Sequence, residues 1–317
     1  MKNVFVFPGQ GSHSIGMLAE LASSERVITD TFTEASGVLG YDLWKLVQNG
    51  PADLLNETVR QQPAMLVAGM ATWRYWKQLG GRDPDVVCGH SLGEYTALAA
   101  AEALAFPAVV ELVRTRAELM QQAVPVGEGA IAAVLGLDDE GIVAACSEAA
   151  QGDVVDLVNF NSPGQVVIAG HVAAVNRALE GCKARGAKRA VLLPMSVPAH
   201  SSLMRPAAEK FAEQLKEVRV RRPAIAFWSP VDCAAHVEPD DIQSLLRQQL
   251  DSPVRWADLV RVLARAGATT FIECGPGKIL TGLGRRIDKQ LQCLALQDPD
   301  SVQEVQATLD SAAGEAA

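Results

Sequence analysis

The sequence predicts an α/β fold in which a large α/β-hydrolase-like domain carries an inserted ferredoxin-like small subdomain. A short apolar run, Asp85–Cys88, meets an alanine-rich segment, Leu92–Ala105, through the pattern G-x-S-x-G, which is typical of a sharp strand-to-helix corner. Residues 125–197 follow the order strand, helix, strand, strand, helix, strand, which is the split β-α-β order of ferredoxin-like units. A chain of 317 residues that is 49% hydrophobic can bury the core that this architecture needs.

The first part of the chain reads as one strand followed by helices. Val4–Phe7 is apolar and is followed by Pro and Gly, which predicts a short strand. The segments between Gly11 and Arg82 read as helices, including an apolar one from Pro63 to about Leu79. After the G-x-S-x-G corner, Pro107 stands at the first-turn position that proline favours, so a further helix is expected over residues 107–124.

The remaining elements alternate between strands and helices. In the small subdomain we expect strands in 129–137, 154–170 (two strands) and 188–195, and helices over 138–150 and 171–186. Beyond it we expect a helix ending at Arg219, an extended run at 224–230, a helix reaching Gln249, a helix at 256–266 and a strand at 269–274. The polar, alanine-rich tail beyond Asp298 is expected to fray. These elements predict a discontinuous catalytic domain, 1–124 with 198–317, around a small subdomain at 125–197.

Composition restricts the class of protein. A net charge of −9 and a pI near 5.1 argue against a general nucleic-acid binder. The six cysteines lie far apart without a C-x-x-C pair, so we expect reduced thiols and no metal site. The first strand begins too early for a signal peptide, and no run reaches the ~18 apolar residues of a membrane span. We therefore expect a cytoplasmic protein.

Ser91 is the candidate nucleophile. It stands between Gly89 and Gly93 at the tip of the predicted corner, where a strained turn would push its hydroxyl out of the sheet and into a cleft. The alternative is a plain strand-to-helix turn without a chemical role, because the five-residue pattern alone also occurs by chance.

His200 is the preferred general base for Ser91 among the five histidines. It follows the small subdomain, at the point where the chain returns to the large domain beside the predicted cleft. His13 is the main alternative, whereas His90 adjoins the serine on a turn that makes neighbouring side chains diverge. His171 and His236 are assigned to a helix start and a polar loop. No acidic residue between Ser91 and His200 stands out as a partner for the base, so a backbone carbonyl is a candidate for that role.

Arg116 is the candidate anion-binding residue. It shares the buried helical stripe of Val109, Leu112, Val113 and Met120, whereas Arg114 lies off the stripe between Glu111 and Glu118. A buried guanidinium needs an anion, and its planar fork suits a carboxylate. That anion is either an internal Asp or Glu or a substrate carboxylate beside Ser91.

Two glycine-containing turns complete the set of candidates. The run FPGQGS, Phe7–Ser12, bends close to the serine corner and could direct a backbone N–H at a developing oxyanion. The run ECGPGKILTGL, residues 273–283, resembles a phosphate loop only loosely, and a plain strand-to-helix turn is the alternative.

Taken together, the motifs resemble those of the malonyl-CoA:acyl-carrier-protein transacylases. The motifs that carry the resemblance, in chain order, are FPGQGS, GHSLGE, the helix of Arg116, NFNSPGQVVIAG, SVPAHSSLM, QQLDSPVRW and GPGKILTGL. The resemblance covers about Val4 to Ile287. The chain departs from the family at His13, where the family usually has glutamine, and at Ala199 in PAHSS, where a serine-containing version is more common; both positions bear on acyl specificity.

The resemblance implies a role for each candidate residue. Ser91 would carry the malonyl group, His200 would act as its base, and the backbone carbonyl of Gln249 would orient the imidazole. Arg116 would bind the malonyl carboxylate, and the amides of Gln10 and Leu92 would form the oxyanion hole.

The implied activity is ping-pong transfer of malonyl from malonyl-CoA to the phosphopantetheine thiol of acyl carrier protein, which supplies extender units for fatty-acid synthesis. It needs no metal or redox cofactor, and a monomer is expected. Basic clusters at 182–189, 218–222 and 284–289 are candidate contacts for an acidic partner. The alternatives are the same chemistry in a polyketide or malonate-decarboxylase system, a serine esterase or thioesterase, and a non-enzymatic carrier-protein docking module.

Overall fold

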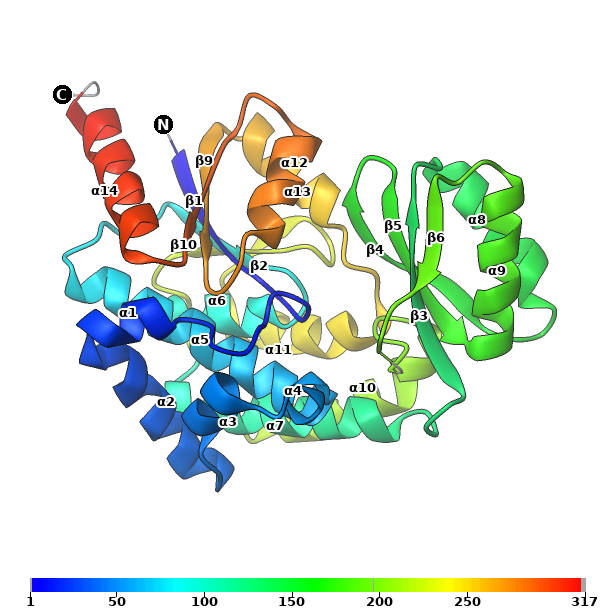
Figure 1. Ribbon diagram of the computed structural model, residues 1–317, viewed down its shortest axis with the longest axis horizontal. Coiled ribbons are helices and arrows are strands. Elements are labelled where there is room, and N and C mark those ends of the chain that lie inside the picture. The colour runs from blue at the N-terminus through cyan, green and yellow to red at the C-terminus, as the bar shows by residue number, and fades with distance from the viewer. Residues whose placement is uncertain (1, 196, 315–317) are drawn as a thin grey trace.

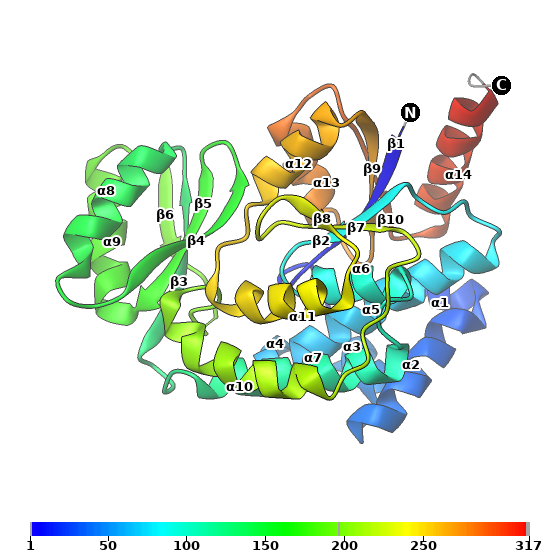
Figure 2. The ribbon, with the colours of Figure 1, turned by 180° about the vertical axis from the view of Figure 1, so that it is seen from behind.

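The computed structural model describes residues 2–195 and 197–314. Its larger sheet has six strands in the order β10-β9-β1-β2-β7-β8 (Figures 1 and 2). These strands are β1 Lys2–Phe7, β2 Val86–Gly89, β7 Ala226–Ser229, β8 Ala234–His236, β9 Ala268–Cys274 and β10 Gln292–Leu296. All neighbouring pairs are parallel except β7 with β8. The connections that follow β1, β2 and β9 therefore meet at one edge of the sheet.

Alternation along β1 explains how both faces of this sheet are covered. Phe5 and Phe7 point into a core shared with helices α5 (Thr58–Gln78) and α7 (Phe106–Gln122), and the ring centroids of Phe5 and Trp73 lie 5.7 Å apart. Val4 and Val6 point to the opposite face, into a core shared with helices α12 (Trp256–Arg265) and α13 (Ile279–Ile287). Successive strand residues face opposite sides, so one apolar strand serves two layers.

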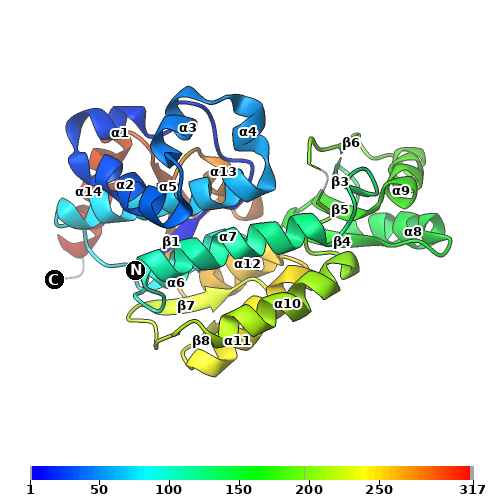
Figure 3. The same cartoon turned by 90° about the horizontal axis from the view of Figure 1, so that it is seen from below.

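The helices of this part of the chain lie on either side of the larger sheet. They are α1 Ala19–Ser24, α2 Arg26–Leu39, α3 Leu43–Asn49, α4 Ala52–Asn56, α5 Thr58–Gln78, α6 Gly93–Ala100, α7 Phe106–Gln122, α10 Arg205–Lys216, α11 Pro239–Gln248, α12 Trp256–Arg265, α13 Ile279–Ile287 and α14 Pro299–Gly314, with 3₁₀ turns at Ser202–Met204 and Gln249–Asp251. Helix α7 lies alongside α10 and runs towards the smaller sheet (Figure 3). None of the helices in the described ranges combines the length and apolarity needed to cross a membrane.

The smaller sheet forms a unit of its own, called here the small unit, residues 129–192; the rest of the described chain is called the large unit. Its elements in chain order are β3 Gly129–Leu135, α8 Asp139–Ala150, β4 Val155–Ser162, β5 Gln165–His171, α9 Val172–Ala184 and β6 Arg189–Leu192. The strands are antiparallel in the order β4-β5-β3-β6, and a separate apolar core joins them to α8 and α9. The order of elements is the one that the sequence predicts. The boundaries at 124/125 and 197/198 stay a prediction, and Ser196 lies outside the described residues.

Strand β4 attaches the small unit to the large unit. The amide of Phe160 donates to the Val254 carbonyl at 2.9 Å, and the amide of Val254 donates to the Val158 carbonyl at 2.9 Å. On the same strand, Asp156 accepts hydrogen bonds from both the amide and the hydroxyl of Ser202, each at 2.8 Å. Since Ser202 follows His200 closely, these bonds tie the position of the candidate base to the small unit.

The prediction of a frayed tail beyond Asp298 is wrong for the residues that the structure describes. Pro299–Gly314 forms α14, and Asp298 caps its start by accepting from the amide of Ser301 at 2.8 Å. Val302, Val305 and Leu309 are buried at helical spacing against the rest of the core. Three apolar residues on one face were enough to dock a helix whose composition is otherwise polar and alanine-rich. Residues 315–317 lie outside the described part.

Candidate active site

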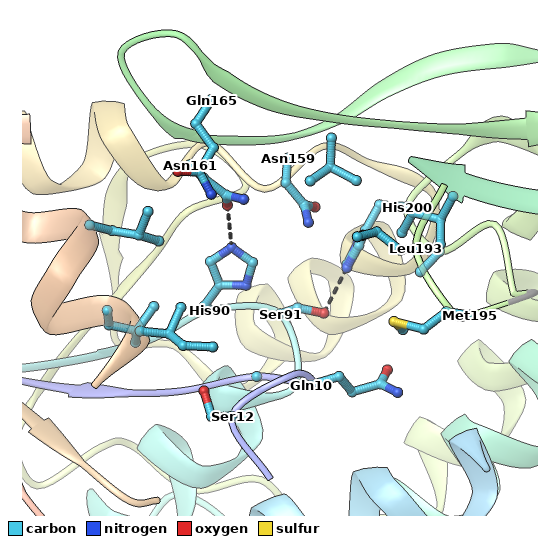
Figure 4. Close-up of a pocket in the computed structure, with 17 residues that line it drawn as sticks. Gln10, Ser12, His90, Ser91, Asn159, Asn161, Gln165, Leu193, Met195 and His200 are labelled. Carbon is cyan, nitrogen blue, oxygen red and sulfur yellow. Dashed lines mark hydrogen bonds between the residues drawn. The ribbon is translucent and has the colours of Figure 1, made fainter. Parts of the chain in front are cut away.

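The turn between β2 and α6 requires the glycines that flank Ser91. Ser91 has φ 52°, in the left-handed region, which non-glycine residues adopt rarely and with strain. A Cβ on Gly89 would collide with the Gly93 backbone, and a Cβ on Gly93 would collide with the Phe7 carbonyl. The turn is therefore packed too closely for side chains on either side, and the serine hydroxyl is directed into a pocket (Figure 4).

His200 contacts Ser91 directly. Its Nε2 lies 2.6 Å from Ser91 Oγ, and its Nδ1 lies 2.8 Å from the backbone carbonyl oxygen of Gln249. A carbonyl only accepts, so Nδ1 carries the hydrogen and Nε2 is free to accept the serine proton. Burial, and then the charge of Arg116, lower the pKa of His200 to about 3, which keeps the imidazole neutral at neutral pH.

The other histidines are engaged elsewhere. His13 lies 2.7 Å from Asn56 Oδ1 and 2.8 Å from Gln61 Nε2, whereas the imidazole in contact with Ser91 Oγ is that of His200. His90 lines the pocket, but its Nε2 contacts Asn161 Oδ1 at 2.9 Å. His171 precedes α9 without capping it, and its Nδ1 accepts from the Val154 amide. His236 lies beside Asp232.

Arg116 is fully buried behind Ser91. It donates from Nη1 to Gln62 Oε1 at 2.6 Å, and from Nη2 to Gln249 Oε1 at 2.9 Å and to Ser91 Oγ at 3.3 Å. Within residues 2–195 and 197–314, no carboxylate forms an ion pair with it. The internal Asp or Glu partner considered from the sequence is therefore not found in direct contact.

Arg114, two residues away on the same helix, has the surroundings that the helical phase predicts. It pairs with Glu111 and, at 3.1 Å, with Glu118, and its side chain is 37% exposed. The two arginines of α7 thus differ in burial and in partners, as their positions on the helix require.

Two backbone amides near Ser91 in the chain, or on the loop that contacts its turn, have no hydrogen-bond partner among the described residues. Among the described residues, the amides of Gln10 and Leu92 take part in no hydrogen bond with another protein group. The side chain of Gln10 is held by Gln61 and Gln62, and a Cβ on Gly9 would lie 2.6 Å from the His90 carbonyl oxygen. The loop after β1 is therefore in contact with the serine turn, where an oxyanion would need its donors.

The pocket encloses about 170 Å³ between the two units. The large unit contributes the serine turn, the loop after β1, Ala199, His200 and the start of α13. The small unit contributes only uncharged residues, which are Ile131, Asn159, Asn161, Gln165 and Val167. Leu193 and Met195, in the large-unit segment that directly follows the small unit, also line the pocket. The described residues hold no group of three or more His, Cys, Asp or Glu side chains placed to bind a metal ion.

The turn at ECGPGK is a plain strand-to-helix connection. Glu273 at the end of β9 accepts hydrogen bonds from the amides of Leu280 and Thr281 at 3.1 and 2.7 Å. The N-terminal amides of α13, which a phosphate would need, are therefore already bound to an internal carboxylate.

Several residues of the site were not found from the sequence. The side chains of Gln62 and Gln249 hold Arg116, and Glu94 lies behind them. Asn159 and Asn161 alternate along β4 with their side chains at the pocket. The sequence NFNSPGQ contains this polar period-two pattern, although it predicts no more than a strand and a turn. Glu94 offered a signal too, because the rest of α6 is apolar or small on every side, so an acid in this helix is buried and needs polar partners.

Comparison with known proteins identifies the family to which this chain is similar. Residues 4–305 match the acyl transferase domain family. The malonyl CoA-acyl carrier protein transacylase of Escherichia coli (strain K12) is 51% identical over 298 residues, which cover 94% of this chain and 96% of the relative. The crystal structure of an acyl carrier protein S-malonyltransferase from Vibrio cholerae has a TM-score of 0.93 at 53% identity, covering 96% of this chain and all (100%) of the other. A type II polyketide acyl-carrier protein in complex with its malonyl-transacylase gives a TM-score of 0.96 at 47% identity, covering 97% and 100%.

Proposed function

We propose that this chain, which belongs to the acyl transferase domain family, transfers malonyl from malonyl-CoA to the phosphopantetheine thiol of acyl carrier protein. Its membership of this family makes it an acyltransferase. The choice of acyl group rests on Arg116. Its buried guanidinium lies 3.3 Å from Ser91 Oγ, and no carboxylate of the described chain contacts it directly. A malonyl group ends in the carboxylate that this guanidinium lacks. The names of the E. coli relative and of the polyketide complex support acyl carrier protein as the acceptor.

The first half-reaction places malonyl on Ser91. His200 Nε2 takes the serine proton as Oγ attacks the thioester carbonyl, and the amides of Gln10 and Leu92 donate to the oxygen of the tetrahedral intermediate. When the C–S bond breaks, His200 gives the proton to the leaving thiolate, so CoA departs as a thiol. The Gln249 carbonyl keeps the imidazole in the tautomer that this sequence needs.

The second half-reaction runs through the same groups in reverse. The carrier thiol gives its proton to His200 Nε2 as its sulfur attacks the malonyl-serine ester. The intermediate collapses, and Ser91 recovers the proton from His200. We infer that the product supplies extender units for fatty-acid synthesis. Because every group in these steps comes from one chain, the activity requires no second subunit, consistent with a monomer.

The proposed architecture follows the same assignment. The parallel order of the larger sheet and the nucleophile turn after β2 support a hydrolase-like catalytic domain at 1–124 and 198–317. The antiparallel order β4-β5-β3-β6 with two helices supports a ferredoxin-like small subdomain at 125–197.

Intact-mass spectrometry after mixing with malonyl-CoA tests the proposal. We expect a malonyl adduct that is absent in Ser91→Ala and that disappears when acyl carrier protein is added, with malonyl recovered on the carrier. His200→Ala should slow adduct formation by about 10²- to 10⁴-fold, whereas His13→Ala should not. Release of free malonate in place of transfer would identify a thioesterase, and absence of any adduct would leave a docking module.

A further inference from the structure

A buried carboxylate lies behind the nucleophile turn and takes no part in the steps above. Glu94 stands in the first turn of α6 and has no exposed surface. One of its oxygens accepts a hydrogen bond from Ser229 Oγ at 2.6 Å, and the other accepts one from Gln249 Nε2 at 2.6 Å. Removing a carboxylate from water costs free energy, so neighbouring groups must interact with Glu94 favourably enough to offset that cost.

The side chain of Gln249 connects Glu94 to Arg116. Its Nε2 donates to Glu94 and also to the backbone carbonyl oxygen of Ser91, at 2.9 Å. Both partners are acceptors, so a flipped amide would place its oxygen against two oxygens. The amide oxygen is therefore directed at Arg116 Nη2, 2.9 Å away. Glu94 thus fixes which end of the Gln249 amide the guanidinium meets.

The hydrogen-bond directions around Glu94 favour its ionised form. The amide of Val231 donates to Ser229 Oγ at 3.1 Å, which leaves the serine hydrogen for Glu94. Both carboxylate oxygens then face donors. Burial raises the pKa of Glu94 to about 7 and Asp232 adds to the rise, against the opposing effects of Ser229, Gln249 and Arg116. At about pH 8 the carboxylate carries its charge.

The charges of Glu94 and Arg116 compensate each other without touching. A buried guanidinium is costly without a counter-charge, yet a carboxylate in direct contact would compete for the N–H groups that a substrate carboxylate needs. Glu94 supplies the negative charge from the far side of Gln249. Arg116 Nε keeps no hydrogen-bond partner among the described residues.

We propose that Glu94 is a positioning residue that, through the Gln249 side chain, holds the Arg116 guanidinium charged, oriented and free of a direct carboxylate, and so sets the preference for acyl groups that end in a carboxylate. This inference rests on the proposed malonyl transfer. It assigns Glu94 an effect on the choice of acyl group and none on the acylation chemistry shared by all acyl-CoAs.

The variant Glu94→Gln tests the negative charge of Glu94, because glutamine has nearly the same size and shape as glutamate but is neutral. With its amide oxygen towards Gln249, the new side chain keeps that hydrogen bond and loses the charge. Its amide nitrogen can still contact Ser229 Oγ, but as a donor, so the direction of that hydrogen bond is reversed. At about pH 8, where the carboxylate of the parent is ionised, we expect kcat/KM for malonyl-CoA to fall by about tenfold to a hundredfold, mainly through KM. The value for acetyl-CoA, which has no carboxylate to place, should change little.

Glu273→Gln is the matched control. Glu273 is also fully buried and hydrogen-bonded, but its partners are the amides of α13 rather than the Arg116 network. Malonyl-CoA and acetyl-CoA differ only in the acyl terminus, so any loss from this variant should affect both alike. The ratio of their kcat/KM values should stay at that of the parent.

A double-variant comparison decides between positioning and general damage. In an Arg116→Ala background, Glu94→Gln should not change the malonyl-to-acetyl ratio further, because the residue through which Glu94 acts is gone. A fall of both substrates alike in Glu94→Gln, or a shift of the ratio that persists without Arg116, would overturn the inference. If Arg116→Ala itself leaves the malonyl preference intact, the proposed function fails instead.

A second variant covers the case in which Glu94→Gln does not fold. Gln249→Met keeps the length of the side chain and the backbone carbonyl that His200 uses, but removes the amide between Glu94 and Arg116. We expect the malonyl-to-acetyl ratio to fall here too. An unchanged ratio in this variant also overturns the inference.

Discussion

The wall of the pocket that the large unit provides differs from the wall that the small unit provides in charge, backbone strain and hydrogen bonding. The large unit holds an imidazole and a nucleophile at the pocket and a fully buried guanidinium behind them, in one connected set of hydrogen bonds. Ser91 and His200 both have positive φ, 52° and 66°. The small unit presents amides and aliphatic side chains, and Asn159 Oδ1 is buried without a partner in the described protein.

This difference suggests that the large unit performs the acyl transfer and that the small unit binds the arm that carries the acyl group. An acyl-transfer site needs catalytic groups that hydrogen bonds and a strained backbone hold in place before the substrate binds. Such groups are already directed at the charge that develops in the transition state. Uncharged amides suit a long neutral arm such as pantetheine, which both substrates share. Changes on the large-unit wall should therefore alter which acyl group reacts and how fast, and changes on the small unit should alter how tightly the carrier binds.

The largest effect is expected at Arg116. Arg116→Ala removes the proposed contact for the malonyl carboxylate, so kcat/KM for malonyl-CoA should fall by about 10²- to 10⁴-fold, since each charge-assisted hydrogen bond contributes about 1.5–3 kcal/mol. The value for acetyl-CoA should rise, because in the parent enzyme its methyl group brings no carboxylate to a buried guanidinium whose counter-charge, Glu94, does not contact it. Arg116→Lys should recover only part of the malonyl preference, because an ammonium has no planar fork. Steady-state kinetics with both acyl-CoAs measures the ratio.

Arg114→Ala is the control on the same helix. Arg114 pairs with Glu111 and Glu118 at the surface, so its loss should leave both kcat/KM values close to those of the parent. If Arg116→Ala weakens both substrates equally, Arg116 serves the fold rather than the acyl group, and the contrast between the two walls disappears.

A smaller effect is expected in the pH dependence of kcat/KM, which distinguishes a buried His200 with a lowered pKa from a histidine with an ordinary pKa. The pKa of His200 is lowered from 6.5 to about 3, so the imidazole stays neutral as pH falls and is protonated only below that value. A histidine with an unshifted pKa would lose about thirtyfold of its neutral form between about pH 8 and pH 5. We expect no such loss in kcat/KM for acetyl-CoA, which reports the free enzyme. A decline with a midpoint near 6.5 in both acyl-CoAs would mean that His200 is more solvated than the structure shows.

The sequence allowed the local parts of the site to be predicted. The corner at Ser91 is specified within five residues, and the burial of Arg116 follows from the period of one helix. The choice of His200 over His13 depended on where the chain re-enters the large unit, and the structure places His200 beside the serine. The small unit was predictable in its order of elements because each strand and helix is short and strongly patterned.

The partners of these residues were not predictable in the same way. Gln62, Glu94 and Gln249 come from three separate elements, and no sequence period relates them, so only the packed fold brings their amides and carboxylate together. Helix α14 was missed for a related reason, since alanine-rich polar composition suggested fraying and the docking of three apolar side chains depends on β10.

The smallest expected effect tests the small unit itself. Lys188 and Arg189 are exposed near the start of β6, and neither forms an ion pair with another described residue. An acidic carrier protein should meet a net-acidic enzyme productively only at a local positive patch. Lys188→Glu with Arg189→Glu should raise KM for acyl carrier protein by roughly fivefold to tenfold, and the difference should shrink at about 0.5 M salt. Acylation by malonyl-CoA alone should stay unchanged, because the reacting groups lie on the other wall.

The matched control reverses two cations of the large unit. Arg219→Glu with Arg221→Glu makes the same change in net charge at exposed positions of the 218–222 cluster. If this pair raises KM for the carrier as much as the Lys188 and Arg189 pair does, the effect comes from net charge and not from a docking face. If neither pair changes KM, the small unit does not steer the carrier, and the 284–289 cluster, where Arg286 donates to Gln165 at the pocket, becomes the face to test. A rise confined to Lys188 and Arg189 would place carrier recognition on the small unit while leaving the chemistry to the large one.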